Sequence, residues 1–350
     1  MIPHSRPTLG PEEKQAIEEV LASGQMVQGK KVAEFEASLA RFVGRRYGMA
    51  VGSGTSALHL SLLALGISAG DEVILPSFTC AALLHALDAV GARPVLADID
   101  PEDFNLSAET LKKKIRKKTR AVIVPHSFGR PADMKKILDF GIPVIEDGTQ
   151  ALGSEAGGRP VGSFGAVSVF SFYATKMITT GEGGMVLTDS RKWADFVRDL
   201  RDYDKKTSYR FRVNSKMTDL AAAMGVEQLK KLPDFIGRRR EIAARYREFF
   251  QNQTAVLPKE DRERPHVYYR FVVRVPKAAK AWLKEISRQG IDAKEPVFKP
   301  LHRYLGFQDS QFPATARAVK ECVSLPIFPS LTDGELDEIG RVLRGVYAPV

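Results

Sequence analysis

Seven short apolar runs lie between Tyr47 and Asp189, and helical patterns follow most of them. The runs are Tyr47–Ser53, Asp71–Ser77, Arg93–Ile99, Ala121–Ser127, Pro143–Asp147, Ala166–Phe172 and Gly184–Asp189. Continuous apolar runs of this length, alternating with helices, indicate a parallel sheet that is buried on both faces. Only a short glycine-containing segment separates the last two runs. It is too short for a crossover, so we expect an antiparallel return there.

The flanking segments predict the rest of an α/β fold. Helical patterns occupy Pro11–Ser23, Lys31–Phe42, Trp193–Arg201, Met217–Leu232 and Phe235–Phe250. A polar, proline-containing stretch then precedes an alternating strand from His266, a helix over Ala278–Gln289 and a last helix over Asp333–Val346. We therefore expect a large domain, residues 1–235, with a mostly parallel seven-stranded sheet between helices. A smaller C-terminal α+β domain, residues 236–350, would start in a linking helix.

The charge balance favours anionic ligands. The chain has 52 Lys and Arg against 42 Asp and Glu, a formal net charge of +10. An excess of this kind attracts anionic small molecules or acidic surfaces. The basic runs Lys112–Lys118 and Arg238–Arg240 contain no aromatic residue, and both fit the solvated face of a helix. Nucleic-acid binding is therefore not expected.

Cysteine use and hydropathy bear on location. Cys80 and Cys322 are the two cysteines, too few for a disulfide framework, which favours a reducing compartment. The first residues contain no apolar core of a signal peptide, and charged residues interrupt the longest apolar stretch. We therefore expect a cytoplasmic protein without a membrane span.

Lys176 follows the sixth apolar run and precedes a glycine cluster. A lysine held partly desolvated at a strand end loses its proton more readily and can form an imine. Most lysines are solvated surface charges, so the residue carries little weight alone. Its neighbours on the predicted sheet decide whether it has a chemical role.

A small-residue turn, GSGTSALHL, follows the first run and leads into a helix. Free N–H groups and the helix dipole at Gly54 and Thr55 could hold a phosphate. An ordinary capped turn is an equally good interpretation of these residues. The turn lacks both the dinucleotide-binding fingerprint and a P-loop lysine.

Acidic and amide side chains follow the fifth run, in the sequence IEDGTQALG. A carboxylate such as Asp147 at the end of a buried strand is costly unless a cation or a donor pairs with it. It could equally cap the next turn. Gln150 follows three residues later, and Ser171 ends the sixth run. Because ligands bind at the carboxyl ends of parallel strands, we expect these groups to converge.

The combination is more specific than its parts. A phosphate cradle, a carboxylate, an amide and an amine on neighbouring strands are what pyridoxal phosphate requires. The amine forms an imine with its aldehyde, and the carboxylate keeps its ring nitrogen protonated. A nicotinamide cofactor needs no such lysine, and no metal site is predicted.

Several stretches together are similar to the DegT/DnrJ/StrS family of sugar aminotransferases, which are fold type I, aspartate-aminotransferase-like enzymes. They are IEDGTQALG, FSFYATKMITTGEGGMV, SGTSALHLSLLALG, GDEVILPSFT, FGRPADM and NSKMTDLAAAMGVEQLKKL. The resemblance extends from about His4 to SLPIFPSLTDGE, nearly the whole chain. It implies transfer of an amino group, with L-glutamate as the usual donor, to a nucleotide-linked keto sugar.

The resemblance also implies residue roles. Lys176 would be the Schiff-base lysine, Asp147 the partner of the pyridine nitrogen, and Gln150 the partner of the 3-hydroxyl. The phosphate would be bound by Gly54, Thr55 and Ser171, with Asn214 reaching it from the neighbouring subunit of a homodimer with shared sites. Lys216 would lie near the diphosphate of the sugar nucleotide, and His302 near the substrate.

Two positions depart from the family pattern. Cys80 stands where relatives often carry an aromatic ring that packs on the cofactor, so either Phe78 takes that role or stacking is weaker. Met177 follows the lysine where asparagine is frequent. Neither change removes a chemical step.

Three other functions stay open at this point. Family dehydratases that remove a sugar hydroxyl carry histidine at the lysine position, so Lys176 argues against that activity. A regulatory protein that binds pyridoxal phosphate without turnover is the second alternative. The third, a nicotinamide oxidoreductase, is disfavoured because the sequence lacks its fingerprint.

Overall fold

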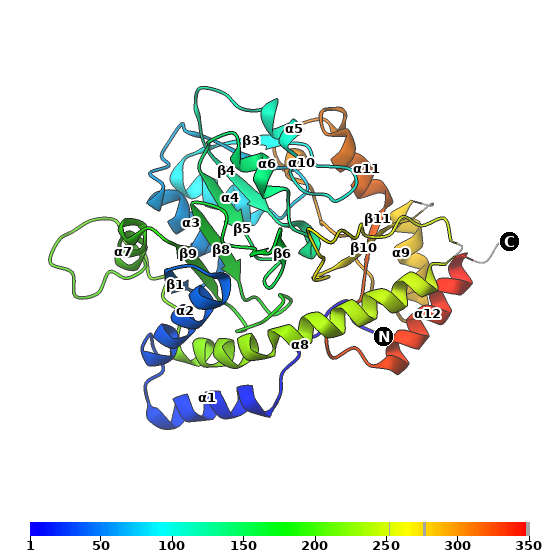
Figure 1. Ribbon diagram of the computed structural model, residues 1–350, viewed down its shortest axis with the longest axis horizontal. Coiled ribbons are helices and arrows are strands. Elements are labelled where there is room, and N and C mark those ends of the chain that lie inside the picture. Colours follow the sequence, from blue (N-terminus) through cyan, green and yellow to red (C-terminus); the bar gives the residue numbers. More distant parts are fainter. Residues whose placement is uncertain (252, 276–277, 348–350) are drawn as a thin grey trace.

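A computed structural model describes residues 1–251, 253–275 and 278–347. Its centre is one seven-stranded sheet in the order β1-β9-β8-β5-β4-β2-β3 (Figure 1). The strands are β1 (Tyr47–Val51), β2 (Glu72–Pro76), β3 (Arg93–Ala97), β4 (Thr119–Pro125), β5 (Val144–Asp147), β8 (Val167–Ser171) and β9 (Gly184–Thr188). All seven predicted runs form strands, which confirms the predicted α/β class.

Strand directions also agree with the sequence. The pairs β2–β3, β2–β4, β4–β5 and β5–β8 are parallel. β9 is antiparallel to both of its neighbours, β1 and β8. The expected antiparallel return after the sixth run is therefore confirmed, and it brings Gly184 opposite Ser171.

Helices cover both faces of the sheet because its strands are apolar on both sides. One face packs against α3 (Gly54–Ala64), α4 (Ala82–Val90) and α7 (Arg191–Leu200). The other packs against α2 (Lys30–Val43), α5 (Ala108–Lys112), α6 (Met134–Leu138) and α8 (Asp219–Phe249). Along β1, Met49 and Val51 enter the first cluster while Ala50 enters the second, as the two-residue period of a strand requires.

The predicted helices Met217–Leu232 and Phe235–Phe250 are one continuous helix, so the predicted break was wrong. α8 contains Pro233 in its interior, where proline removes one hydrogen bond and normally kinks a helix. Leu232, Phe235 and Ile236 around it are buried in the core. This packing on both sides of the proline offsets the lost bond, and α8 runs from α1 (Pro11–Ser23) to α12 (Asp333–Tyr347) (Figure 1).

The C-terminal part builds a second apolar cluster on the far half of α8. Ile242 and Tyr246 of α8 pack there with the antiparallel pair β10 (Phe271–Arg274) and β11 (Cys322–Leu325). α9 (Ala279–Arg288) and α12 complete the cluster. We propose the domain boundary at residues 235 and 236, because Phe235 and Ile236 of α8 still pack in the cluster beside the sheet, whereas Ile242 and the later apolar residues of α8 pack in this C-terminal cluster. The remaining elements are α10 (Leu301–Tyr304), α11 (Pro313–Glu321), the hairpin β6 (Glu155–Ala156) and β7 (Arg159–Pro160), and two short 3-10 turns.

The strand predicted from His266 begins only at Phe271. Tyr268 has φ +51°, a left-handed conformation that interrupts the pleat. The N–H of Val267 donates to the carbonyl of Gly129 at 3.0 Å, and the N–H of Arg270 to that of Phe128 at 3.1 Å. The segment 266–270 therefore attaches to the loop after β4 instead of extending β10.

The described residues include neither a candidate membrane span nor a candidate metal-binding cluster. No helix among them is long and apolar enough to cross a membrane. They also contain no group of three or more His, Cys, Asp and Glu side chains that could hold a metal ion.

Candidate active site

The turn between β1 and α3 lies against the end of β8. Ser53 caps α3 by accepting a bond from the N–H of Ser56, while within the described residues the N–H groups of Gly54 and Thr55 have no partner. A Cβ at Gly54 would lie only 2.7 Å from the Cβ of Ser171. The two free N–H donors and the Ser171 hydroxyl thus adjoin one another, an arrangement suited to a phosphate.

Asp147 ends β5, and only 4% of it is exposed. Its Oδ1 accepts a bond from the N–H of Thr149 at 3.0 Å. Its Oδ2 has no hydrogen-bond partner in the part of the chain that the structure describes. A buried carboxylate with a free oxygen is costly, and a cationic N–H group of a ligand would satisfy it.

Glu146 precedes Asp147 on the other face of the strand and is completely buried. It accepts four hydrogen bonds: Oε1 from His126 at 3.0 Å and Gly162 at 2.6 Å, Oε2 from Phe164 and Gly165 at 2.8 Å each. Burial raises the pKa of Glu146, but the His126 bond and these N–H groups outweigh it and lower the pKa below its ordinary value. Glu146 therefore has a structural role.

Gln150 is oriented by a backbone bond. Its Oε1 accepts from the N–H of Phe128 at 2.8 Å. This contact leaves the NH₂ group to donate elsewhere. An amide held in this orientation suits a ligand oxygen.

Lys176 lies beside an aromatic ring. Its Nζ is 5.2 Å from the centroid of the Tyr269 ring, and the Tyr269 hydroxyl is 3.5 Å from Oγ1 of Thr175. Burial raises the pKa of Tyr269, but Lys176 and then Arg270 outweigh it and lower the pKa to about 8. Tyr269 is not among the site residues predicted from the sequence. No motif points to it, because its contact with Lys176 depends on the irregular backbone at Tyr268.

Cys80 shares this electrostatic environment, whereas Phe78 does not line it. Cys80 is an exposed residue, yet protein atoms packed around its thiol raise the pKa, which Lys176 lowers and Asp147 raises. Phe78 is 2% exposed and packs 5.9 Å from Phe104 and 6.0 Å from Phe128, measured between ring centroids. The structure thus places Phe78 in an aromatic cluster with Phe104 and Phe128, and weaker stacking at the Cys80 position stays a prediction.

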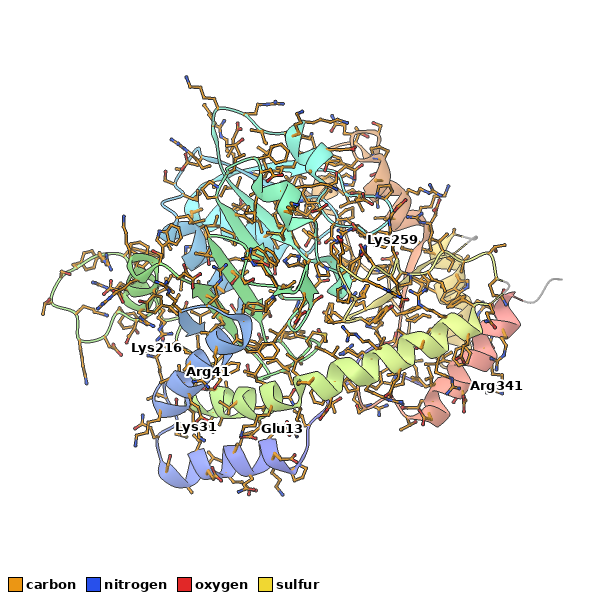
Figure 2. The ribbon with its side chains drawn as sticks, viewed as in Figure 1. Glu13, Lys31, Arg41, Lys216, Lys259 and Arg341 are labelled. Carbon is orange, nitrogen blue, oxygen red and sulfur yellow. The ribbon has the colours of Figure 1, made fainter. Side chains whose placement is uncertain are left out.

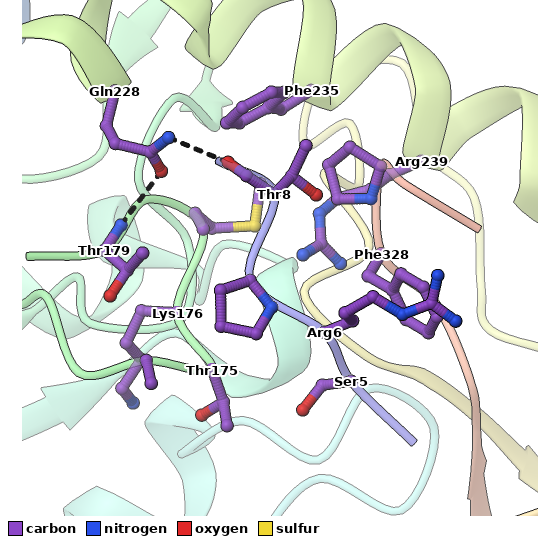
Figure 3. Close-up of a pocket in the computed structure, with 14 residues that line it drawn as sticks. Ser5, Arg6, Thr8, Thr175, Lys176, Thr179, Gln228, Phe235, Arg239 and Phe328 are labelled. Atoms are coloured by element: carbon purple, nitrogen blue, oxygen red, sulfur yellow. Dashed lines mark hydrogen bonds between the residues drawn. The ribbon is translucent and has the colours of Figure 1, made fainter. Parts of the chain in front are cut away.

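A narrow cavity lies beside Lys176, between the N-terminal segment and α8 (Figure 3). Gln228 donates to the carbonyl of Thr8 at 2.9 Å and accepts from the N–H of Thr179 at 3.2 Å. These two bonds hold the N-terminal segment against the loop that follows Lys176.

Arg239 lines the same cavity and is only 3% exposed, so the prediction of a solvated face for Arg238–Arg240 was wrong at this residue. Its Nη1 donates to the carbonyls of Tyr268, Tyr269 and Ile327 at 3.1, 3.3 and 2.8 Å. The guanidinium satisfies backbone oxygens left unpaired by the irregular segment 266–270.

Asn214 and Lys216 lie in the segment between α7 and α8. Asn214 is exposed, and its neighbour Ser215 accepts a bond from the N–H of Gly52 at 2.8 Å. Asn214 is therefore close in sequence to a contact with the Gly54 turn. Lys216, at the base of the loop after α7 (Figure 2), bonds Asp202 at 2.9 Å and Asp204 at 3.2 Å, so an anion would compete with both carboxylates.

His302 is placed differently from the other predicted site residues. It is completely buried, with Nδ1 2.6 Å from the Ser77 hydroxyl and Nε2 2.9 Å from Asp309. The ring also stacks on Phe312. Both ring nitrogens are engaged, so the geometry favours a structural role, and its contact with substrate stays a prediction.

A family comparison agrees with this arrangement. The profile of the DegT/DnrJ/EryC1/StrS aminotransferase family matches residues 7–344. The chain belongs to this family. Membership implies pyridoxal phosphate as cofactor, and the chain's free donors at Gly54 and Thr55 and the free oxygen of Asp147 fit that group.

Relatives in sequence cover the whole chain. The spore coat polysaccharide biosynthesis protein SpsC of Bacillus subtilis (strain 168) is 34% identical over 99% of this chain and 97% of its own length. A pleiotropic regulatory protein of Geobacillus stearothermophilus is also 34% identical, over 97% and 95%.

Solved structures with the same fold also match nearly the whole chain. The aminotransferase TlmJ from Streptoalloteichus hindustanus has a TM-score of 0.94 and 32% identity, covering 99% of this chain and 98% of its own. A sugar aminotransferase described as putative, Spr1654 from Streptococcus pneumoniae in its PLP form, has a TM-score of 0.93 and 26% identity over 99% and 98%. The dehydratase ColD, at 23% identity, 98% and 100% coverage and a TM-score of 0.88, shares the fold alone.

Proposed function

We propose that this protein transfers an amino group, with L-glutamate as donor, to a nucleotide-linked keto sugar, using pyridoxal phosphate. The observation that carries the proposal is that Lys176 and the buried Asp147 lie close enough to Cys80 for both to shift the pKa of its thiol. The N–H groups of Gly54 and Thr55, which have no partner among the described residues, adjoin Ser171 at the end of β8. Similarity to aminotransferases over nearly the whole chain supports it.

Each residue has a separate task. Gly54, Thr55 and Ser171 would hold the cofactor's phosphate, with Asn214 added from the partner subunit of a homodimer. Asp147 would accept a bond from the ring N–H, and the NH₂ of Gln150 would donate to the ring hydroxyl. When bound, pyridoxal phosphate supplies an aldehyde that takes up amino groups and a ring that accepts electrons from the reacting carbon.

Lys176 would move the proton in both halves of the reaction. Its amine lies 5.2 Å from the centroid of the Tyr269 ring, which would cover one side of that amine. Donor carboxylates and the nucleotide diphosphate are anions, which the net charge of +10 attracts. Lys216 would lie near that diphosphate. To bind it, the Lys216 amine would have to leave Asp202 and Asp204, its present partners.

A direct assay tests the proposal. Wild-type and Lys176→Ala protein, each loaded with pyridoxal phosphate, are given ¹⁵N-glutamate and a panel of keto sugar nucleotides, and products are read by mass spectrometry. Labelled amino sugar should form with the wild type and not with Lys176→Ala. Wild-type turnover by Lys176→Ala would reject the role of the lysine. Lys192→Ala, a surface lysine on α7, is the matched control and should be fully active.

A regulatory role is the second candidate, because a relative at 34% identity is described as a pleiotropic regulatory protein. Protein that absorbs as a pyridoxal phosphate complex but converts no glutamate with any keto sugar nucleotide would favour it. Release of a sugar hydroxyl without incorporation of ¹⁵N would instead indicate the dehydratase, against which Lys176 argues. The cytoplasmic location stays a prediction.

A further inference from the structure

A second hollow of about 570 Å³ lies away from Lys176, between α8 and the segment 260–268. Arg240 and Arg247 of α8 form one wall, and Arg262 and His266 belong to the opposite wall. Neither the proposed reaction nor the cofactor uses these residues. The hollow has the size of a small-molecule site.

The acidic residues of the hollow are already paired. Glu260 pairs with Arg247 at 3.2 Å and accepts from the Tyr268 hydroxyl. Asp261 pairs with Arg130 at 3.2 Å and Arg264 at 3.4 Å.

Two arginines have no such counterpart. Among the residues that the structure describes, Arg240 donates only to the carbonyl of His266, at 3.2 Å. In the described part of the chain neither Arg240 nor Arg262 contacts a carboxylate. The hollow therefore carries two guanidinium groups whose charge is not balanced locally.

His266 adds a neutral donor. It is 7% exposed, and its Nδ1 accepts from the N–H of Tyr268 at 2.8 Å, so the ring proton is on Nε2. Nε2 has no partner among the described residues. Burial, then Arg130, Arg247 and Arg240, lowers the pKa of His266 to about 3, which keeps the ring neutral and shows that several cations act on this point.

We propose that this hollow binds a phosphate-bearing anion, with Arg240 and Arg262 as charged ligands and the His266 Nε2–H as a third donor. One guanidinium satisfies both oxygens of a carboxylate, whereas two guanidinium groups on opposite walls and a further N–H match the larger oxygen set of a phosphate or diphosphate. The site is separate from the proposed cofactor cradle but shares backbone with the Lys176 region. Tyr268 lines the hollow, Tyr269 contacts Lys176, and Arg239 bonds both carbonyls.

Titration calorimetry with inorganic pyrophosphate tests this site. The protein is loaded with pyridoxal phosphate, so that the cofactor cradle is filled, and ionic strength is held constant with NaCl. Wild-type protein should bind saturably. Arg240→Gln and Arg262→Gln should each weaken the affinity about tenfold or more, the scale of a charged hydrogen bond. Arg262 is exposed and has no carboxylate partner in the described ranges, so its variant should fold normally.

Arg238→Gln is the matched control. Arg238 is two positions before Arg240 but bonds Asp333 and Glu241 instead, so its variant should bind pyrophosphate like the wild type. Absence of saturable binding to the wild type, wild-type affinity in both test variants, or a loss in Arg238→Gln as large as in the test variants would overturn the proposal. Lys176→Ala should retain the affinity, which separates failure of this site from failure of the proposed reaction.

Discussion

Two adjacent carboxylates at the end of β5 have opposite environments. Glu146 is buried and accepts four hydrogen bonds, from His126 and three backbone N–H groups. Asp147 is nearly as buried, but among the described residues its carboxylate accepts one hydrogen bond, from the backbone N–H of Thr149. Sequence position does not distinguish them, since both follow the same apolar run.

The difference shows how burial and saturation together identify a site. A buried acid whose oxygens are fully bonded stabilises the fold and has no capacity for a ligand. A buried acid with an unused oxygen is tolerated because something else is to bind there. Glu146 thus belongs to the scaffold, and Asp147 to the proposed active site.

The largest effect is expected from Glu146→Gln. The new NH₂ would face N–H donors, so a buried network loses its acceptor, and the free energy of unfolding should fall by about 3–5 kcal/mol. Urea unfolding followed by circular dichroism measures this. A loss under about 1 kcal/mol would contradict the structural role.

Asp147→Asn should have the opposite profile. The amide oxygen can still accept from Thr149 and the NH₂ replaces an oxygen without a partner, so stability should stay within about 1 kcal/mol of the wild type. Amino transfer should drop about 10²–10³-fold, because a neutral amide does not stabilise a positive ring nitrogen. Wild-type activity in this variant would remove Asp147 from the proposed mechanism.

His126→Gln tests whether the hydrogen bond from His126 to Glu146 stabilises the fold. The His126 Nδ1 accepts from the N–H of Ala132 at 2.9 Å and its Nε2 donates to Glu146. Losing either bond leaves a buried group unsatisfied, so stability should decrease by about 1–3 kcal/mol. In the double variant with Glu146→Gln the two losses should be less than additive; full additivity would mean that the two side chains act independently.

Low pH should reduce the difference in stability between the wild type and Glu146→Gln. The folded-state pKa of Glu146 is lowered, so its contribution is fully present above the unfolded pKa of about 4.3 and is lost as pH falls through the folded value. The stability gap between wild type and Glu146→Gln should therefore narrow below about pH 4.3, at no more than about 1.4 kcal/mol per pH unit. A gap that stays constant from pH 7 to pH 3 would exclude a depressed pKa.

Much of the fold was predictable because its signals are local. Apolar runs identified all seven strands, and the helices predicted over Pro11–Ser23 and Lys31–Phe42 agree with α1 and α2. Pro233 and the alternation from His266 gave wrong predictions because tertiary contacts overrode them. Core packing keeps α8 continuous, and the left-handed Tyr268 redirects the backbone toward the loop after β4.

The three consecutive arginines show the same limit. As sequence they form one basic run, yet Arg238 pairs with Asp333, Arg239 is buried on three carbonyls, and Arg240 faces the second hollow. Because they lie on a helix, their three side chains point in different directions around its axis. What each direction meets depends on segments about 30 to 90 residues away.

The sequence by itself determined the sheet, its antiparallel return and a coherent set of residues for one cofactor, because strand period and residue chemistry are local properties. Only the tertiary structure decided which buried polar groups are already satisfied. It distinguished Asp147 from Glu146, engaged both nitrogens of His302, placed Tyr269 beside Lys176 and, within the described residues, left Arg240 and Arg262 without a carboxylate partner. These differences arise from contacts between segments that are far apart in the chain, and local sequence patterns do not predict such contacts.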